Sequence, residues 1–373
     1  IHTGLVVVGE IGGGDRLEQL ALGETPNVAA RLQSLAEPDA VVISDATERL
    51  VEGLFDFDAL GAQQLKGVAV PVGAHCARAS RGVAGRFEVS LRRGLTPLVG
   101  RRLELEILAE GWQAARTGVR VVNVVGEAGI GKSRVVHEFG AGVSGEEAFF
   151  LRGHCTSEGH TTPFLPFIEV VRGSFRIGEG DARTEEKLAR GLELLGLRGD
   201  EILPYLLHLL GRAPAEVRAL DAEILGLRTR RALQRLLEGR CRLSPTVMIV
   251  EDLHWIDTAS EEYLEWATEP GWALPLLIVC TYRPGYRSPW TGRANVTELH
   301  LESLSRTSTI ELVTSRLGAA ALPPRLQARV AEKAEGNPLF AEEIATYLQE
   351  TAAARGAEPA PDREIALPVP LAN

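Results

Sequence analysis

The sequence has few of the features that mark secreted, membrane-spanning or disulfide-stabilised proteins. Its four cysteines are scattered and form no Cys-x-x-Cys pair. The longest apolar runs, such as ALPLLIVC, reach about half of the roughly 20 residues that a membrane-spanning helix needs. No basic segment followed by an apolar one, as in a secretory signal, opens the chain. We therefore expect a cytoplasmic protein with reduced thiols, no structural zinc site and no membrane partner.

Acidic residues outnumber basic ones, and methionine is scarce. The formal net charge of −10 argues against a nucleic-acid or anionic-membrane surface across the whole chain. Hydrophobic residues make up 45% of the 373, which is typical of globular proteins, and the length suffices for two domains. The single methionine is Met248, and the chain ends in the proline-rich run LPVPLAN. We expect an internal piece of a longer protein that continues at both ends.

The first 80 residues alternate short β-type runs with helical segments. LVVVGEI, AVVIS and VPVGAHCARA have the character of strands. Pro26 opens a helix at a position where proline is tolerated, the EPD triplet at 37–39 closes it, and Asp45 caps a second short helix. The run Gly9–Gly14 is spaced wrongly for a dinucleotide-binding loop, so we expect a glycine-rich hairpin turn there.

From Thr96 onward, apolar strands alternate with longer helices. VRVVNVVGE, FFLRGHC, TVMIVED and LPLLIVCTYRP are continuous apolar runs, as strands buried on both faces of a parallel sheet require. Helical stretches occupy approximately 180–240 and 305–352. This alternation predicts an α/β fold with a parallel sheet.

One glycine-rich stretch between a strand and a helix matches the phosphate-binding pattern G-x-x-x-x-G-K-[ST]. Its glycines permit a tight turn in which successive N–H groups point at the β- and γ-phosphates, and the following helix adds a favourable dipole. Lys132 would contact the phosphate oxygens, and Ser133 would bind magnesium. ATP and Mg²⁺ are therefore the predicted ligands. The residues of this loop are Gly126, Glu127, Ala128, Gly129, Ile130, Gly131, Lys132 and Ser133.

Two acidic residues follow another apolar strand. The run at 247–250 delivers Glu251 and Asp252 to its carboxyl end, where ligands of open α/β sheets bind. One carboxylate would hold magnesium, and the other would orient or deprotonate the attacking water. The sequence leaves open which carboxylate has which role.

Four stretches together resemble the STAND branch of AAA+-related signalling ATPases. They are LVGRRLELE, the phosphate loop, IVEDLHWID and GNPLF, and they extend over residues 97–353. The resemblance implies that Val99, Gly100 and Arg101 line the adenine pocket. It also implies that Arg283 senses the γ-phosphate and that Gly336 and Pro338 of a helical lid touch the nucleotide. No arginine finger acting in trans is evident, which favours a slow switch over a processive motor.

Asn27 and Arg31 are four residues apart and so share one face of a helix. Alone, such a pair is typical of a solvated surface. Their surroundings, however, resemble the carboxyl-terminal half of a class III nucleotide cyclase domain: IHTGLVVVGEIGGG, LGETPNVAARLQ, PDAVVISDAT and LKGVAVPV. The resemblance implies that Asn27 positions the ribose, Arg31 stabilises charge on the phosphate, and Lys66 contacts a phosphate.

Two departures from the cyclase pattern limit its activity. Leu20 stands where the base is often read, and it cannot hydrogen-bond adenine or guanine, so the choice between ATP and GTP is open. The family's two metal-binding aspartates are expected upstream of Ile1, and its sites form between two such domains. We predict that this chain makes no cyclic nucleotide by itself and that a second cyclase domain is a partner of the parent.

These patterns predict an α/β P-loop NTPase sheet with a helical lid, preceded by part of an α+β, ferredoxin-like cyclase domain. The predicted boundaries are 1–80 for the cyclase part, 81–95 for a linker, 96–295 for the NTPase core, 296–353 for the lid and 354–373 for a loose tail. We expect an ATPase that signals through a cyclase in the parent, with further protein partners beyond Asn373. Two alternatives remain: an ATP switch with a degenerate cyclase domain, and an ATP-dependent transcriptional regulator.

Overall fold

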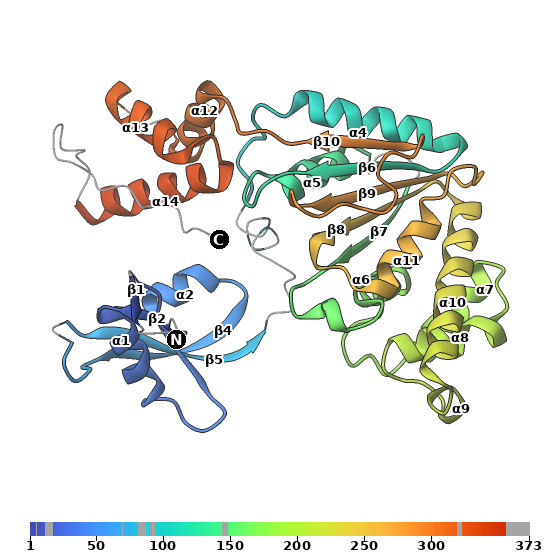
Figure 1. Ribbon diagram of the computed structural model, residues 1–373, viewed down its shortest axis with the longest axis horizontal. Coiled ribbons are helices and arrows are strands. Elements are labelled where there is room, and N and C mark those ends of the chain that lie inside the picture. The colour runs from blue at the N-terminus through green and yellow to red at the C-terminus, as the bar shows by residue number, and fades with distance from the viewer. Residues whose placement is uncertain are drawn as a thin grey trace. The chain divides into compact units, whose positions relative to one another are not determined.

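The computed structural model describes residues 1–4, 6–11, 18–68, 70–80, 94–143, 148–318 and 323–355, together with residues 87, 89 and 91. The chain forms two compact units, Ile1–Leu95 and Thr96–Asn373 (Figure 1). The centre of the turn predicted at 9–14, most of the predicted linker and nearly all of the predicted tail lie outside the described residues.

The described part of the first unit contains antiparallel sheets and short helices. Strands β1 (Val7–Ile11) and β2 (Glu18–Leu22) pair with each other, and β3 (Val41–Ser44), β5 (Val72–Ser80) and β4 (Phe55–Gln63) form a sheet in that order. Helices α1 (Glu24–Gln33) and α2 (Asp45–Val51) complete the unit. A small core of buried side chains consists of Val28, Leu32, Val42, Leu65, Val68 and Ala74.

Several local predictions for this unit were wrong. Helix α1 begins at Glu24, before Pro26, and ends at Gln33. Ser44 rather than Asp45 caps α2, because its side chain accepts from the Thr47 N–H, while Asp45 lies 2.7 Å from the His75 ring. Strands β2 and β4 were not predicted; β4 is exposed along most of its length, so it lacks the alternation that a half-buried strand shows.

A parallel sheet organises the second unit, as predicted, and it has five strands where the sequence indicated four. Its spatial order is β10-β6-β9-β8-β7, so β6, the first of these strands in the chain, lies between β9 and β10 (Figure 1). The strand bounds are β6 Arg120–Val125, β7 Phe149–His154, β8 Thr246–Glu251, β9 Leu276–Tyr282 and β10 Val296–His300. Strands β8 and β9 are buried along their whole length, which explains their continuous apolar sequences.

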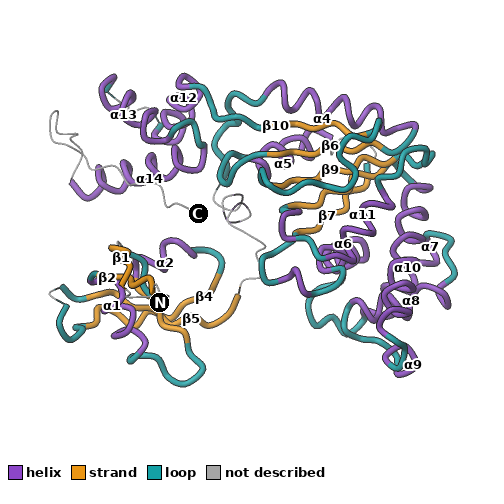
Figure 2. The backbone as a smooth tube through the Cα atoms, viewed as in Figure 1, coloured by secondary structure: helices purple, strands orange, loops and turns teal. Residues whose placement is uncertain are grey.

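Helices cover both faces of this sheet (Figure 2). Each face has its own apolar core. Helices α4 (Arg102–Ala114) and α5 (Lys132–Val143) pack on one face. The other face carries α6 (Leu165–Phe175), α7 (Thr184–Leu194), α8 (Gly199–Leu209), α10 (Ala222–Leu243) and α11 (Thr258–Ala267). Short helices are α9 (Ala215–Arg218), η1 (Ala115–Thr117), η2 (Gly159–Thr161) and η3 (Leu253–Trp255). None of the described helices is long and apolar enough to cross a membrane.

Three C-terminal helices form the helical lid: α12 (Arg306–Leu317), α13 (Pro324–Ala334) and α14 (Pro338–Arg355). They share a separate apolar cluster that also contains Val99 and Leu304. The predicted lid began too early, because Val296–His300 is strand β10 and pairs with β6 in the main sheet. It also ended slightly too early, because α14 continues to Arg355.

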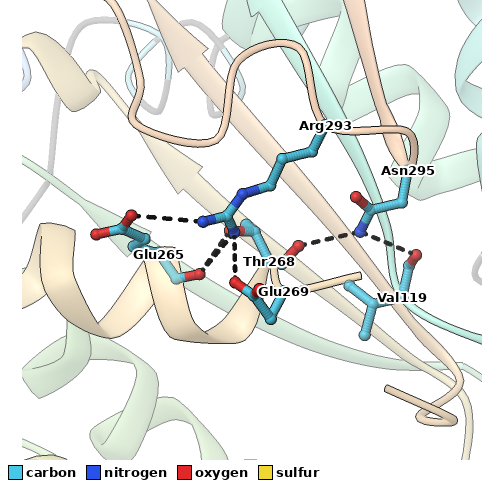
Figure 3. A network of polar contacts seen from close by, with 6 residues as sticks. All are labelled: Val119, Glu265, Thr268, Glu269, Arg293 and Asn295. Carbon is cyan, nitrogen blue, oxygen red and sulfur yellow. Dashed lines mark hydrogen bonds and ion pairs between the residues drawn. The ribbon is translucent and has the colours of Figure 1, made fainter. Parts of the chain in front are cut away.

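A polar network closes the end of the sheet at which β6 and β10 begin (Figure 3). Arg293 donates to the Glu265 carbonyl at 2.9 Å and to Thr268 Oγ1 at 3.0 Å, and it pairs with Glu269 at 3.1 Å. Asn295 donates to the carbonyls of Thr268 (3.0 Å) and Val119 (3.4 Å). The network ties the end of α11 to the residues before β6 and β10.

Candidate nucleotide-binding site

The phosphate loop lies between β6 and α5 at the carboxyl edge of the sheet. Gly129 and Gly131 have φ angles of 74° and 99°, which L side chains rarely adopt. A Cβ at Gly129 would also lie 2.8 Å from Asn337 Oδ1. The N–H of Gly126 donates to the Tyr282 carbonyl at 3.2 Å, which fixes the loop to the end of β9. Glycine is therefore required here both by conformation and by the approach of the lid.

Lys132 is the first residue of α5 and is buried. Its Nζ donates to the carbonyl oxygens of Gly126 (2.8 Å) and Glu127 (3.0 Å). Burial lowers the pKa of Lys132, and the nearby carboxylate of Asp252 opposes this shift. A bound phosphate would offer the ammonium group charged acceptors, which form stronger hydrogen bonds than two neutral carbonyls.

The two acidic residues after β8 lie in different environments. Glu251 is 6% exposed; burial raises its pKa, but hydrogen bonds from His154 and Ser133 and the charge of Arg152 leave the pKa below its ordinary value. Asp252 has a 46% exposed side chain, and partial burial beside Glu251 raises its pKa. Its backbone is left-handed, with φ of 59°, and its N–H donates to Thr281 Oγ1 at 3.1 Å. Opposite shifts in neighbouring carboxyl groups indicate separate roles.

His154, at the end of β7, was not predicted as a site residue. Its Nδ1 lies 2.9 Å from Glu169 Oε2 on α6, and its Nε2 lies 3.5 Å from Glu251 Oε1. Burial lowers the pKa of His154, but the two carboxylates outweigh this effect and raise the pKa to about 10. Glu251 is therefore held beside a charged imidazolium. The only local signal in the sequence was a histidine at a strand end.

Arg283 follows β9 and brings a second positive charge to this edge. Its charge contributes to the pKa shifts of Lys132, Asp252 and His254, so the guanidinium group lies within electrostatic reach of all three. Within the ranges that the structure describes, Arg283 forms no ion pair. The structure thus brings together the predicted residues Lys132, Ser133, Glu251, Asp252 and Arg283.

The predicted adenine-pocket residues have varied surroundings. Val99 is buried in the apolar cluster of the lid, and Gly100 has φ of 69°. Arg101 is 5% exposed, and its Nη2 donates to the carbonyls of Ile130 (3.0 Å) and Glu302 (2.8 Å). Arg101 therefore links the phosphate loop, through hydrogen bonds, to the segment that precedes the lid helices. A cavity of about 520 Å³ lies against Gly100, Arg101, α4 and Glu138 of α5.

The helical lid contacts the phosphate loop directly. Asn337 Nδ2 donates to the Ala128 carbonyl at 2.9 Å, and the Leu339 N–H donates to the Gly129 carbonyl at 3.3 Å. Pro338 Cγ lies 3.9 Å from the position of a Cβ on Gly131. Gly336 has φ of 73°, and a Cβ there would overlap the Leu304 carbonyl oxygen. Both predicted lid residues, Gly336 and Pro338, thus lie in the turn that meets the loop, and Asn337 between them was missed.

These features fit Mg·ATP. The loop's left-handed glycines shape an N–H cradle, and Lys132 and Arg283 offer two cations to phosphate oxygens. Ser133 and Glu251 provide adjacent oxygen ligands of the kind that magnesium prefers. No group of three His, Cys, Asp or Glu side chains positioned for a metal ion occurs in the described residues.

The predicted cyclase residues lie on the surface of the first unit. Asn27 and Arg31 are exposed on α1, where Asn27 Nδ2 donates to the Gly23 carbonyl at 3.4 Å. Lys66 is exposed between β4 and β5. No hydrogen bond or ion pair joins the three among the described side chains. The side chain of Leu20, on β2, lies outside the described residues.

Family models match both units. Residues 1–76 match the adenylate and guanylate cyclase catalytic domain, and residues 97–279 match the AAA ATPase domain. Residues 305–354, the lid, match a domain of unknown function, DUF8739. The chain thus joins part of an adenylate and guanylate cyclase catalytic domain to an AAA ATPase domain.

Relatives in Rhizobium meliloti (strain 1021) match parts or most of this chain. One, described as uncharacterized, is 32% identical over 332 residues, which cover 87% of this chain and 32% of that protein. Adenylate cyclase 1 is 38% identical over 69 residues, which cover 18% of this chain and 10% of that protein. The chain therefore spans a third or less of the length of these relatives.

Among solved structures, a STAND protein with a tetratricopeptide repeat sensor from Pyrococcus horikoshii is similar to this chain. It is 18% identical with a TM-score of 0.36, and the match covers 70% of this chain and 34% of that protein. A similarity at this level carries no argument about function. The P-loop architecture described above rests on the strand order and the phosphate loop of the chain itself.

Proposed function

We propose that the second unit is a STAND-type ATP switch that binds Mg·ATP at the carboxyl edge of its sheet and hydrolyses it slowly. The observation that carries this proposal is the convergence of two cations and two carboxylates around the phosphate loop. Lys132, Glu251 and Asp252 lie at the ends of adjacent elements, and Arg283 acts on them electrostatically. The phosphate oxygens and the magnesium ion of bound Mg·ATP would complete such a site.

The environments of the two acids support an assignment of roles. Glu251 is buried, ionised and hydrogen-bonded to Ser133, so we assign these two residues to the hydrated magnesium ion. Asp252 is more exposed and has a raised pKa, so we assign it to the attacking water. Lys132 and Arg283 would bind the terminal phosphate oxygens. Bound magnesium would neutralise phosphate charge as the bond to the leaving group breaks.

Calorimetry with Mg·ATP tests this proposal. We expect micromolar binding by the chain and a loss of about tenfold or more in Lys132→Ala, because a charged phosphate contact is removed. Lys333→Ala is a matched control, because Lys333 is an exposed lysine on α13. If the wild-type chain folds but does not bind Mg·ATP, or if both variants bind equally, the ATPase proposal is wrong.

The lid is the element that would report the nucleotide state. Asn337 and Leu339 bind carbonyls of the phosphate loop, and Thr96, the first residue of the unit, donates to Glu342 of α14 at 2.7 Å. If phosphate binding changes the conformation of the loop, these contacts would transmit the change to the lid and, through α14, to Thr96. We expect hydrogen exchange of α14 amides to differ among ADP, an ATP analogue and no nucleotide. Identical exchange in all three states would contradict the switch.

We further propose that the intact parent couples this switch to the synthesis of a cyclic nucleotide. The cyclase family match and the similarity to adenylate cyclase 1 support this role over the transcriptional alternative. In the parent, Asn27 and Arg31 would act on the ribose and phosphate, with Lys66 as a further phosphate contact. The chain alone should form no cyclic AMP or cyclic GMP. Product formation that Asn27→Ala abolishes would contradict that expectation.

A further inference from the structure

His254 is a histidine at the proposed ATPase site whose ring nitrogens are enclosed and have no hydrogen-bond partner in the described part of the chain. It lies in η3, two residues after Asp252, and its side chain is 12% exposed. Neither Nδ1 nor Nε2 has a hydrogen-bond partner within the described residues, and both atoms are enclosed. A buried polar group without a partner is destabilising, so native structures rarely contain one without a reason.

The groups around His254 belong to the proposed site. Nδ1 lies 4.0 Å from Asp252 Oδ1, about 1 Å beyond the length of a hydrogen bond. Burial, and then the charges of Arg283 and Lys132, lower the pKa of His254 to about 4. The ring is therefore neutral near neutral pH and carries one N–H donor and one lone pair.

We propose that His254 positions Asp252 when ATP is bound, by donating its Nδ1–H to the carboxylate so that the carboxylate faces the attacking water. This inference rests on the proposed ATPase function and adds a residue to it. In the structure, Lys132 and Arg283 attract Asp252 electrostatically. Once phosphate oxygens engage both cations, the Nδ1 of His254, 4.0 Å from Asp252 Oδ1, is placed to donate to this carboxylate. The main chain of Asp252 is held by Thr281, so only its side chain has to rotate.

Packing alone does not explain a histidine at this position. The ring lies 5.2 Å from the Trp255 ring, a contact that phenylalanine would also make. Phenylalanine would remove two unpaired nitrogens, and exchanging such groups for apolar ones of similar shape is neutral or stabilising. His254→Phe should therefore leave the nucleotide-free chain at least as stable as the wild type, whereas a structural histidine would lower the free energy of unfolding when replaced.

Three variants test the positioning role. The amide nitrogen of asparagine falls near the position of Nδ1, and that of glutamine near Nε2. We expect His254→Phe and His254→Gln to lower the rate of ATP hydrolysis by about tenfold or more, with the Kd for Mg·ATP within about twofold of wild type. His254→Asn should retain the rate within about threefold, because it keeps the donor. Calorimetry, steady-state kinetics and denaturant unfolding without nucleotide supply the three readouts.

The outcomes separate this inference from the function on which it rests. A wild-type rate in His254→Phe, or an asparagine variant as slow as the phenylalanine variant, overturns the positioning role and leaves the ATPase proposal intact. If all three His254 variants lose both folding stability and Mg·ATP binding, the positioning role is also wrong, and the histidine has a structural role. A folded wild-type chain that does not bind Mg·ATP overturns both proposals. If the phenylalanine variant does not fold, the contrast between asparagine and glutamine decides.

Discussion

Arg283 and Arg293 lie in the same connection, between β9 and β10, yet the structure gives them opposite surroundings. Arg293 donates to Glu265 and Thr268 and pairs with Glu269, so its charge is compensated within the protein (Figure 3). Arg283 has no ion pair in the described part of the chain and acts on Lys132 and Asp252 through space. A compensated arginine stabilises a fold, and an uncompensated one near a phosphate loop is available to a ligand.

The same contrast extends to the two edges of the sheet. At the amino edge, Asn295 links Val119 and Thr268. At the carboxyl edge, Lys132 rests on loop carbonyls and His254 has unpaired nitrogens. Stability and function therefore separate spatially, so variants at the two edges should have different phenotypes.

The largest expected effect is on catalysis, in Arg283→Ala. Removing a cation from the developing phosphate charge should lower the hydrolysis rate by about a hundredfold, equivalent to roughly 2.7 kcal/mol. The free energy of unfolding should stay within about 0.5 kcal/mol of wild type, since no compensated pair is lost. Steady-state kinetics and denaturant unfolding measure the two quantities. Arg287→Ala, at an exposed arginine in the same connection, is the control and should change neither.

The second prediction is the reverse phenotype, in Arg293→Ala. It removes two hydrogen bonds and the ion pair with Glu269 at the end of α11, so unfolding should become easier by about 2 kcal/mol. The Kd for Mg·ATP should change by less than about twofold at a temperature where the variant is folded. Arg231→Ala, at an exposed arginine on α10, serves as the control. A variant with normal stability and weakened nucleotide binding would break the contrast between the two arginines.

A smaller effect is expected at the contact between lid and loop. Asn337→Ala removes the hydrogen bond to the Ala128 carbonyl, a neutral contact worth about 1 kcal/mol. Exchange of α14 amides in the nucleotide-free chain should therefore accelerate by about fivefold, with little change in global stability. Ser315→Ala provides a control within the lid, because its hydroxyl bonds only the Leu312 carbonyl of its own helix among the described contacts. Equal acceleration in both variants would show general loosening of the lid.

How far the sequence predicts these features depends on whether their cause is local. The phosphate loop, the strand before it and the acidic end of β8 were recognised because each is a continuous pattern with its own stereochemistry. Parallel strands buried on both faces are continuous apolar runs, so the five-stranded sheet was largely foreseen. Strand β4 was missed because its residues are mostly exposed, and β10 was assigned to the lid because its pairing with β6 is far away in sequence.

The missed site residues depend on tertiary contacts. Glu169 reaches His154 from α6, and Asn337 reaches Ala128 across 209 positions of sequence. The sequence does not indicate that His154 will contact two carboxylates, nor that His254 will have no hydrogen-bond partner among the described residues. His154 ends strand β7 and His254 lies three residues after strand β8, yet their pKa values shift in opposite directions because their neighbours differ in charge.

His154 therefore offers the most selective prediction, a pH dependence of stability in the absence of magnesium and nucleotide. Its pKa is about 10 in the folded chain and about 6.5 in an unfolded one. The folded state thus holds the proton more tightly, and this stabilisation is complete below about pH 6.5 and declines as the pH rises towards 10.

The prediction compares His154→Gln with the wild type. Glutamine keeps hydrogen-bonding capacity but cannot carry the charge that faces Glu251 and Glu169. The difference in unfolding free energy between the two proteins should be largest near pH 6.5 and should shrink steadily by pH 9.5, as measured by denaturant titration in a chelator. His160→Gln, at an exposed histidine, should show no such trend. A difference that stays constant or grows with pH would mean that His154 is neutral in the folded chain and that Glu251 is held by Ser133 and Arg152 alone.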